Sequence, residues 1–167
     1  MRPIGIATLF FAGLCSVPAG AAAEEQTKTE EAVARPVTIT FANVVPETGA
    51  IWVSVCTEAQ LTAQMSGAGG ECAANAIVDA AEGAEATFEG LAPGVYAASV
   101  FHDENGNGRL DFDNRGIPIE ATGSSNNARG SFGPPTFAQM SFELGPMSAD
   151  ATPMTFTIEL YKVVIDF

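Results

Sequence analysis

The residues with the clearest chemical potential form a short polar stretch in the second half of the chain. Between Asp103 and Asp111, oxygen-bearing side chains stand at the first, third, fifth and ninth positions, and a glycine stands at the sixth. This spacing is typical of the first part of an EF-hand-type calcium loop, in which alternate residues turn inward and the glycine permits a sharp turn. The predicted calcium ligands are the side chains of Asp103, Asn105, Asn107 and Asp111 and the carbonyl oxygen of Arg109.

The end of this stretch departs from the EF-hand pattern. Asn114 stands at the twelfth position, where an EF-hand has a bidentate Glu, and no flanking helices are predicted. Asp113 is the candidate replacement. With so few carboxylates we expect a dissociation constant of about 10⁻⁴ to 10⁻³ M, as in extracellular calcium modules. The alternative is a plain Asn-Gly-rich turn whose side chains cap their own backbone.

A second polar segment follows about a dozen residues later. It combines a hydroxyl, two side-chain amides and a guanidinium, on Ser125, Asn126, Asn127 and Arg129. Such groups recognise carboxylates or sugar hydroxyls well, so we predict that these four residues bind a ligand. They also cap loops, which is the alternative.

A catalytic site is harder to assemble from this sequence. His102 is the chain's single histidine, and Asp103 beside it could orient it as a general base. The nucleophile is missing, because Ser124 and Ser125 lie in no Gly-x-Ser-x-Gly motif. We therefore predict no enzymatic activity and keep a small hydrolase, using His102 and loop carboxylates, as the alternative.

The N-terminus has the three parts of a secretory signal. Arg2 is followed by an apolar stretch from Ile4 to Val17 and by small residues at 19–23, which predicts cleavage after Ala23 and a periplasmic or secreted protein. Cleavage changes the net charge from −13 to −14.

Because a protein with this negative charge is repelled by nucleic-acid phosphates and anionic lipid surfaces, we expect no nucleic-acid partner and no membrane insertion after cleavage. An envelope protein or a glycan is the expected partner.

Two cysteines, Cys56 and Cys72, remain after the predicted cleavage. An even number in an oxidising compartment predicts one disulfide. A bridge over a loop of this length would stabilise the fold by about 3 kcal/mol in the chain-entropy model.

The chain after the signal is predicted to form one domain. Residues 24–35 are polar and charged, which is typical of a disordered linker. From residue 36 to 167 short segments of period-two hydrophobicity alternate with turn residues, which predicts an all-β antiparallel sandwich of six to eight strands, immunoglobulin-like or transthyretin-like. The expected strands are Val37–Phe41, Ile51–Val55, Ile77–Val78, Ala84–Phe88, Val95–His102, Phe137–Leu144 and Met154–Val164.

Two features of connectivity are also expected. The first two strands are predicted to form a hairpin. The stretch from Asp103 to Pro135 is too long for a simple connection in a compact domain, so we expect one long functional loop at this end of the sandwich.

Several motifs in order resemble the bacterial domain-of-unknown-function family 2141 over about residues 36–162. They are the strand Gly49–Cys56, the triplet Gly94–Tyr96, the stretch Phe101–Asp111, and the segments Ser125–Gly130 and Phe132–Pro135. The resemblance implies an exported β-sandwich of bacterial envelopes and no settled activity.

We expect a non-enzymatic binding or structural module whose long end loop is ordered by calcium. Besides the hydrolase, the remaining alternative is a soluble carrier of an apolar ligand held between the sheets.

Overall fold

The computed structural model describes residues 33–46, 48–131, 133–147 and 152–163. The predicted signal at 1–23 and most of the predicted linker at 24–35 lie outside these residues. Contacts divide the chain into the units Met1–Glu30 and Glu31–Phe167, and the second unit contains every described residue. Within it, no described helix has the length and apolar character needed to span a membrane.

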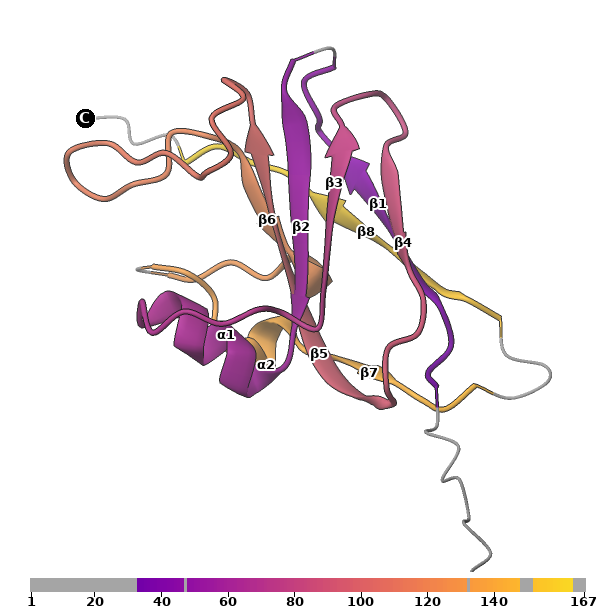
Figure 1. Ribbon diagram of the computed structural model, residues 1–167. Helices are drawn as coiled ribbons and strands as arrows, with labels where there is room; N and C mark the ends of the chain where they lie inside the picture. Colours follow the sequence, from indigo (N-terminus) through magenta and orange to yellow (C-terminus); the bar gives the residue numbers. More distant parts are fainter. Residues whose placement is uncertain (1–32, 47, 132, 148–151, 164–167) are drawn as a thin grey trace, which may run out of the picture. The chain divides into compact units, whose positions relative to one another are not determined.

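Two sheets form the domain, which confirms the predicted all-β sandwich (Figure 1). One sheet has the strand order β4-β1-β8, and the other has the order β3-β2-β5-β6, with β7 paired to the start of β5. The strands are β1 (Val37–Ala42), β2 (Ala50–Cys56), β3 (Ala74–Asp79), β4 (Glu85–Phe88), β5 (Gly94–Asp103), β6 (Thr122–Ser124), β7 (Phe142–Leu144) and β8 (Met154–Glu159).

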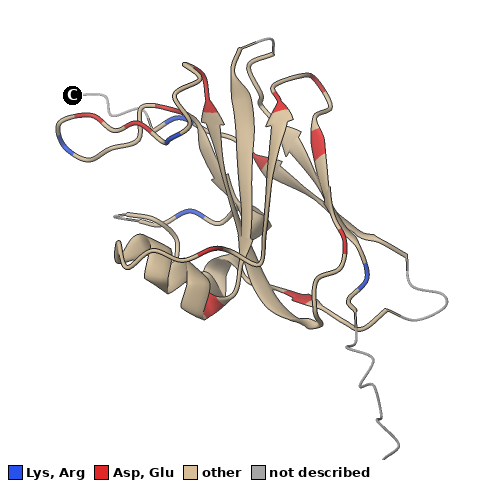
Figure 2. Cartoon of the chain, in the orientation of Figure 1, with Lys and Arg blue, Asp and Glu red and all other residues tan. Residues whose placement is uncertain are grey.

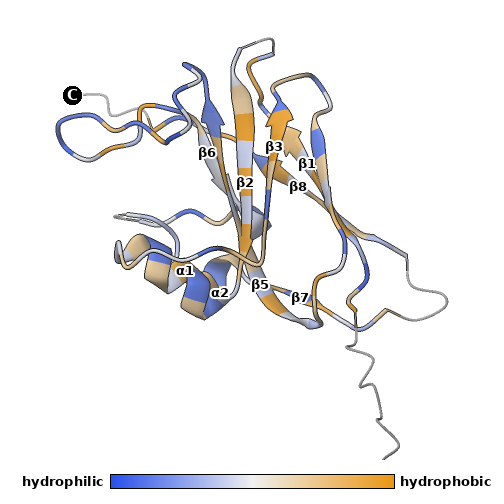
Figure 3. Ribbon diagram, viewed as in Figure 1, coloured by the Kyte–Doolittle hydropathy of each residue, from blue (hydrophilic) through white to orange (hydrophobic). Residues whose placement is uncertain are grey.

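Alternating side chains place the core between the two sheets. In β1 and β2 every second residue is buried, as the period-two pattern predicts. Figure 3 shows the corresponding orange, hydrophobic bands along β2. Fully burying one large aliphatic side chain contributes about 1.5–3 kcal/mol, so this face holds the sheets together. The large core residues include Ile39, Ile51, Leu144, Ile158 and Leu160.

The predicted hairpin of the first two strands is wrong. β1 pairs antiparallel with β4 and parallel with β8, whereas β2 pairs with β3 and β5 in the other sheet. The chain crosses between the sheets after β1, where Asn43 adopts a left-handed φ of 61°. In the immunoglobulin arrangement the first two strands share a sheet, so this strand order departs from it.

The structure contains two α-helices, and the second occupies part of a segment that the sequence predicts as a strand. The helix α1 (Glu58–Met65) begins at a capping box of Thr57 and Gln60. The helix α2 (Phe137–Met140) begins at the same kind of box and occupies the first half of a predicted strand, of which β7 is the remainder. A reciprocal cap satisfies two backbone N–H groups at a helix start, and this local gain outweighs the strand pattern.

The predicted disulfide between Cys56 and Cys72 is present, with Cα atoms 4.5 Å apart. It closes the segment that contains α1 and holds this segment against the outer face of the five-stranded sheet. A second, smaller core forms there from Cys56, Leu61, Cys72, Ala97 and Met140. The stretch from Asp103 to Pro135, which the sequence predicts as one long loop, contains β6 and the short helix η1 (Ser125–Asn127).

Candidate functional site

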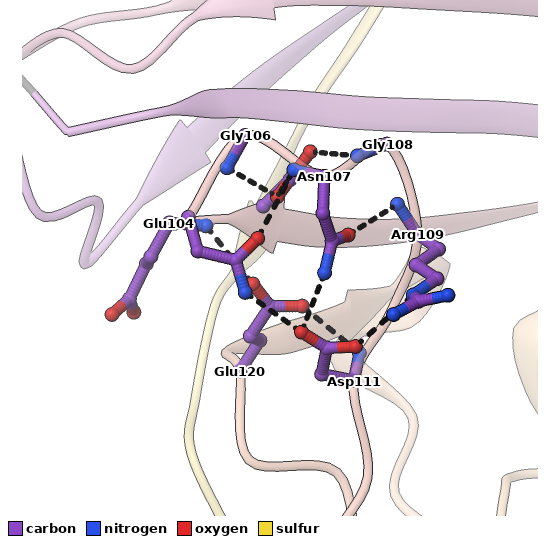
Figure 4. Close-up of polar contacts among 9 residues, drawn as sticks. Glu104, Gly106, Asn107, Gly108, Arg109, Asp111 and Glu120 are labelled. Carbon is purple, nitrogen blue, oxygen red and sulfur yellow. Dashed lines mark hydrogen bonds and ion pairs between the residues drawn. The ribbon is translucent and has the colours of Figure 1, made fainter.

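The first residue of the candidate calcium loop, Asp103, is fixed at the last position of β5. Its side chain is only 2% exposed. Its Oδ1 accepts hydrogen bonds from the backbone N–H groups of Gly106 (2.8 Å) and Asn107 (3.1 Å), and its Oδ2 accepts one from Gly108 (2.7 Å) (Figure 4). Gly49 presses against the Asp103 carbonyl oxygen, where a Cβ atom would not fit. The buried Asp103 carboxylate therefore fixes the turn at the start of the loop by accepting hydrogen bonds from three of its backbone N–H groups.

The carboxylate of Asp111 lies at the far side of the same loop. Its Oδ2 accepts hydrogen bonds from the side-chain amides of Asn105 and Asn107, both at 2.7 Å, and Arg109 Nε lies 3.4 Å from its Oδ1. The hydrogen bond from Asn105, reinforced by Asn107 and Arg109 and opposed by partial desolvation, lowers the pKa of Asp111 below its ordinary value. The structure thus brings the predicted side-chain ligands together.

Glu120 is a member of this cluster that the sequence analysis missed. It is 4% exposed; its Oε1 accepts the backbone N–H of Glu104 and its Oε2 that of Asp111, each at 3.1 Å. Figure 4 shows its carboxylate directed into the loop, whereas the side chain of Glu104 points away. Glu120 lies nine residues after Asp111, beyond the reach of a twelve-residue loop pattern, so no sequence signal identified it.

Asp113, the candidate replacement at the loop's end, belongs to the following turn. It accepts hydrogen bonds from the backbone N–H groups of Arg115 and Ile117, both at 2.9 Å, and pairs with the Arg115 guanidinium at 2.8 Å. The bond from Ile117, followed by those from Arg115, lowers the pKa of Asp113. The structure therefore leaves Asp113 outside the cluster of Asp103, Asp111 and Glu120.

The described geometry shows these side chains capping their own backbone, and calcium binding stays a prediction. Among the described residues, no group of three or more His, Cys, Asp or Glu side chains is arranged to hold a metal ion by itself. Amide and carbonyl oxygens would have to complete a coordination shell. Asp103 Oδ1 and Asp111 Oδ2 already accept two hydrogen bonds each, whereas Asp103 Oδ2 and the two Glu120 oxygens accept one each and keep a further lone pair.

Comparison with protein families identifies the chain's relatives. The family model described as "uncharacterized protein conserved in bacteria (DUF2141)" matches residues 21–152. The chain belongs to this family. Neither a curated protein nor a solved structure gives a significant match.

The predicted ligand segment of this DUF2141 domain is largely engaged with its own backbone. Ser125 is fully buried, and its hydroxyl bonds to the backbone of Ala98 and Met140. Asn126 donates to carbonyl oxygens in and after α2, and Asn127 accepts the N–H of Glu159 at 2.8 Å. A ligand role for these three residues stays a prediction, and the described bonds match the capping alternative.

Arg129 is placed differently from the other three residues of this segment. Its guanidinium carbon lies 4.1 Å from the centre of the Tyr161 ring, and its side chain is 55% exposed. The guanidinium is 3.9 Å from the Glu159 carboxylate. Arg129 is therefore the charged residue of the segment, and its side chain is accessible to solvent, whereas Ser125 is buried.

His102 lies inside the DUF2141 domain and is 0% exposed. Its Nε2 is 2.6 Å from the carbonyl oxygen of Thr48, so Nε2 carries the proton and donates it. Because β5 alternates, His102 faces the core while Asp103 faces the outer side of the sheet. The histidine is therefore remote from any external substrate.

A large hollow lies on the outer face of the five-stranded sheet of this DUF2141 domain. Its volume is about 1250 Å³. The sheet forms its floor, α1 and α2 lie along one side, and the loop that follows Asp111 lies along another. A smaller hollow of about 500 Å³, lined in part by Trp52 and Ile77, continues along the same face. Both lie outside the sandwich, not between its sheets.

Proposed function

We propose that this protein is an exported module of the bacterial cell envelope that binds other molecules without transforming them. We further propose that calcium, held by the loop from Asp103 to Glu120, orders its binding end. The N-terminal pattern of Arg2, an apolar stretch and small residues supports export. The disulfide supports it as well, because such bridges persist in oxidising compartments.

The observation that carries the calcium proposal is that the two side-chain amides of the loop bond to one carboxylate, while two further carboxylates bond to the backbone of the loop. Asp111 Oδ2 lies 2.7 Å from the amide nitrogens of both Asn105 and Asn107, while Asp103 and Glu120 anchor the backbone around them. Rotation of each amide by half a turn places its oxygen where its nitrogen lies, at the loss of the hydrogen bond that each amide oxygen now accepts from a backbone N–H group. The same side chains then present the oxygen ligands that calcium prefers.

Electrostatics supports a cation at this position. The loop contains the carboxylates of Asp103, Asp111 and Glu120, and a divalent cation would neutralise part of this negative charge. Arg109 is the basic side chain beside Asp111, and it is 76% exposed at a distance of 3.4 Å. An exposed pair of this kind contributes little, so a bound cation would supply most of the neutralisation.

The binding role is supported by the placement of His102 and of the outer hollow. A fully buried histidine that donates to a backbone carbonyl cannot serve as a base toward an external substrate. The hollow, by contrast, is open, and its volume of about 1250 Å³ is somewhat above the roughly 300–1,000 Å³ of a typical ligand site.

Calorimetric titration of calcium chloride into chelator-treated protein tests the proposal. We expect saturable heat with a Kd of about 10⁻⁴ to 10⁻³ M. Asp111→Asn and Glu120→Gln should each weaken binding at least about tenfold, because each removes a charged ligand. Asp79→Asn, which removes an exposed acid on β3, should not.

A titration without heat, together with thermal melts that superimpose with and without millimolar calcium, would refute the calcium proposal. Export is tested separately. Periplasmic or secreted material whose N-terminus lies near Glu24 supports it, and an intact Met1 on cytoplasmic protein contradicts it.

A further inference from the structure

The hollow on the outer face gathers basic side chains in a strongly acidic chain. Arg115, Arg129 and Lys162 line it, and no Asp or Glu is among the described lining residues. The whole chain has only 7 Lys and Arg against 20 Asp and Glu. Figure 2 shows blue segments in the long loop, where red segments lie beside them, and in the segment after η1. The lining is therefore richer in basic side chains than the molecule as a whole, and each of these cations has an acidic neighbour just outside the lining.

The same hollow is lined by apolar side chains that the fold leaves in solvent. Met65 is 58% exposed, Phe112 is 55% exposed and Val163 is 42% exposed, and all three line it. Leu61, Leu110 and Ile117 extend this apolar lining from α1 and from the long loop. Exposed apolar side chains gathered around one hollow mark a binding site, because leaving them in water costs free energy.

The floor of the hollow contains three serine residues at paired positions on neighbouring strands. Ser54 of β2 is paired with Ser99 of β5, and Ser99 with Ser124 of β6, so the three side chains form one row across the sheet. The neighbouring row contains Trp52, Phe101 and Thr122, in which the two aromatic rings stack with centroids 5.8 Å apart. An apolar surface with a few convergent polar groups is the usual chemistry of a small-molecule site.

The three cations have partners that a ligand can displace or share. Lys162 is 2.7 Å from Glu104, and Arg115 is 2.8 Å from Asp113. The cationic side chains are 44% and 47% exposed, and exposed ion pairs contribute about 0–1 kcal/mol. Arg129 is held over the Tyr161 ring, and its guanidinium lies 3.9 Å from the Glu159 carboxylate in an exposed pair of the same weak kind.

We propose that this hollow binds a single-chain anionic amphiphile, namely a long-chain carboxylate. The acyl chain lies against the apolar wall of Met65, Phe112 and Ile117, and the carboxylate is held by Arg129, assisted by Arg115 and Lys162. Guanidinium groups match the planar carboxylate and can bind it with two parallel hydrogen bonds. A free carboxylate carries a single negative charge, so the net charge of −13 opposes it much less than it opposes an anionic membrane surface, and the ligand is a separate molecule. The inference rests on the proposed binding role and not on calcium.

Titration of carboxyl-¹³C-labelled palmitate, followed by NMR, tests this inference on the intact protein in the presence of a calcium chelator. We expect one saturable bound signal whose carboxylate stays ionised to lower pH than free palmitate, because the cations favour the charged form. Arg129→Gln should weaken binding about tenfold, and Phe112→Ser should weaken it to a similar degree. Arg35→Gln removes the same charge away from the hollow and should leave the affinity unchanged.

Matched ligands separate the parts of the proposal. Palmityl alcohol, which keeps the chain and lacks the charge, should bind more weakly, and acetate, which keeps only the charge, should not bind measurably. Equal binding of palmitate by the Arg129→Gln protein would overturn the inference. Absence of palmitate binding, or binding of an acidic sugar oligomer in its place, would also overturn it. A saturable calcium titration in that case would leave the calcium part of the proposed function standing.

Discussion

The buried carboxylate of Asp103 accepts a hydrogen bond from the backbone N–H of Gly108, with 2.7 Å between oxygen and nitrogen. Together with its bonds to Gly106 and Asn107, this contact folds the start of the long loop around a single side chain. One acidic residue at the end of the central strand therefore determines where the loop begins to turn.

Replacing Asp103 should destabilise the domain even without calcium. In Asp103→Ala, the N–H groups of Gly106 and Gly108 lose their acceptor while that of Asn107 keeps Asn105 Oδ1, and losing the buried carboxylate should cost about 1–3 kcal/mol. Urea unfolding in a chelator, followed by circular dichroism, measures the change. The control Asp79→Ala removes an exposed acid on β3 and should stay within about 0.5 kcal/mol of the parent protein. Equal midpoints for the Asp103 variant and its control would show that the loop does not depend on this carboxylate.

Lowering the pH should weaken the hydrogen bonds that Asp111 accepts within the loop. The hydrogen bond from Asn105, with help from Asn107 and Arg109, lowers the pKa of this carboxyl in the folded protein. A group with a lowered folded pKa contributes stability above its unfolded pKa of about 3.9, and this contribution is lost as the pH falls through the folded value. NMR titration of the carboxyl carbon should therefore show a midpoint below the ordinary one.

The double variant Asn105→Ala and Asn107→Ala provides the comparison for this titration. Without the two amide donors the pKa of Asp111 should rise toward its ordinary value. Asp113, whose pKa is lowered mainly by the backbone of Ile117, should titrate as before. Parallel shifts of both residues would indicate a general loosening of the loop and contradict a specific role for the amides.

Part of this structure could be predicted from the sequence because it depends on neighbours along the chain. The alternation of β5 places Asp103 on the outer face, and the even cysteine count predicts the pairing of Cys56 with Cys72. The parallel partner of β1 could not be predicted, because pairing between distant strands depends on packing of the whole core. Glu120 could not be predicted for the same reason. It lies just before β6, and only the folding of the long loop brings its carboxylate to the backbone of Glu104 and Asp111.

Gly123 shows how closely the two sheets approach beneath the outer hollow. A Cβ atom at this position would lie 2.6 Å from Ile158 Cγ2 and 2.9 Å from the carbonyl oxygen of Glu159. Gly123→Ala should therefore push β6 away from β8 and cost roughly 1–3 kcal/mol, as overpacking of a filled core does. Thermal unfolding measures this loss against Gly145→Ala, where an added Cβ meets nothing within 4 Å. If both variants melt at the same temperature, the contact between β6 and β8 is loose enough to accept a methyl group.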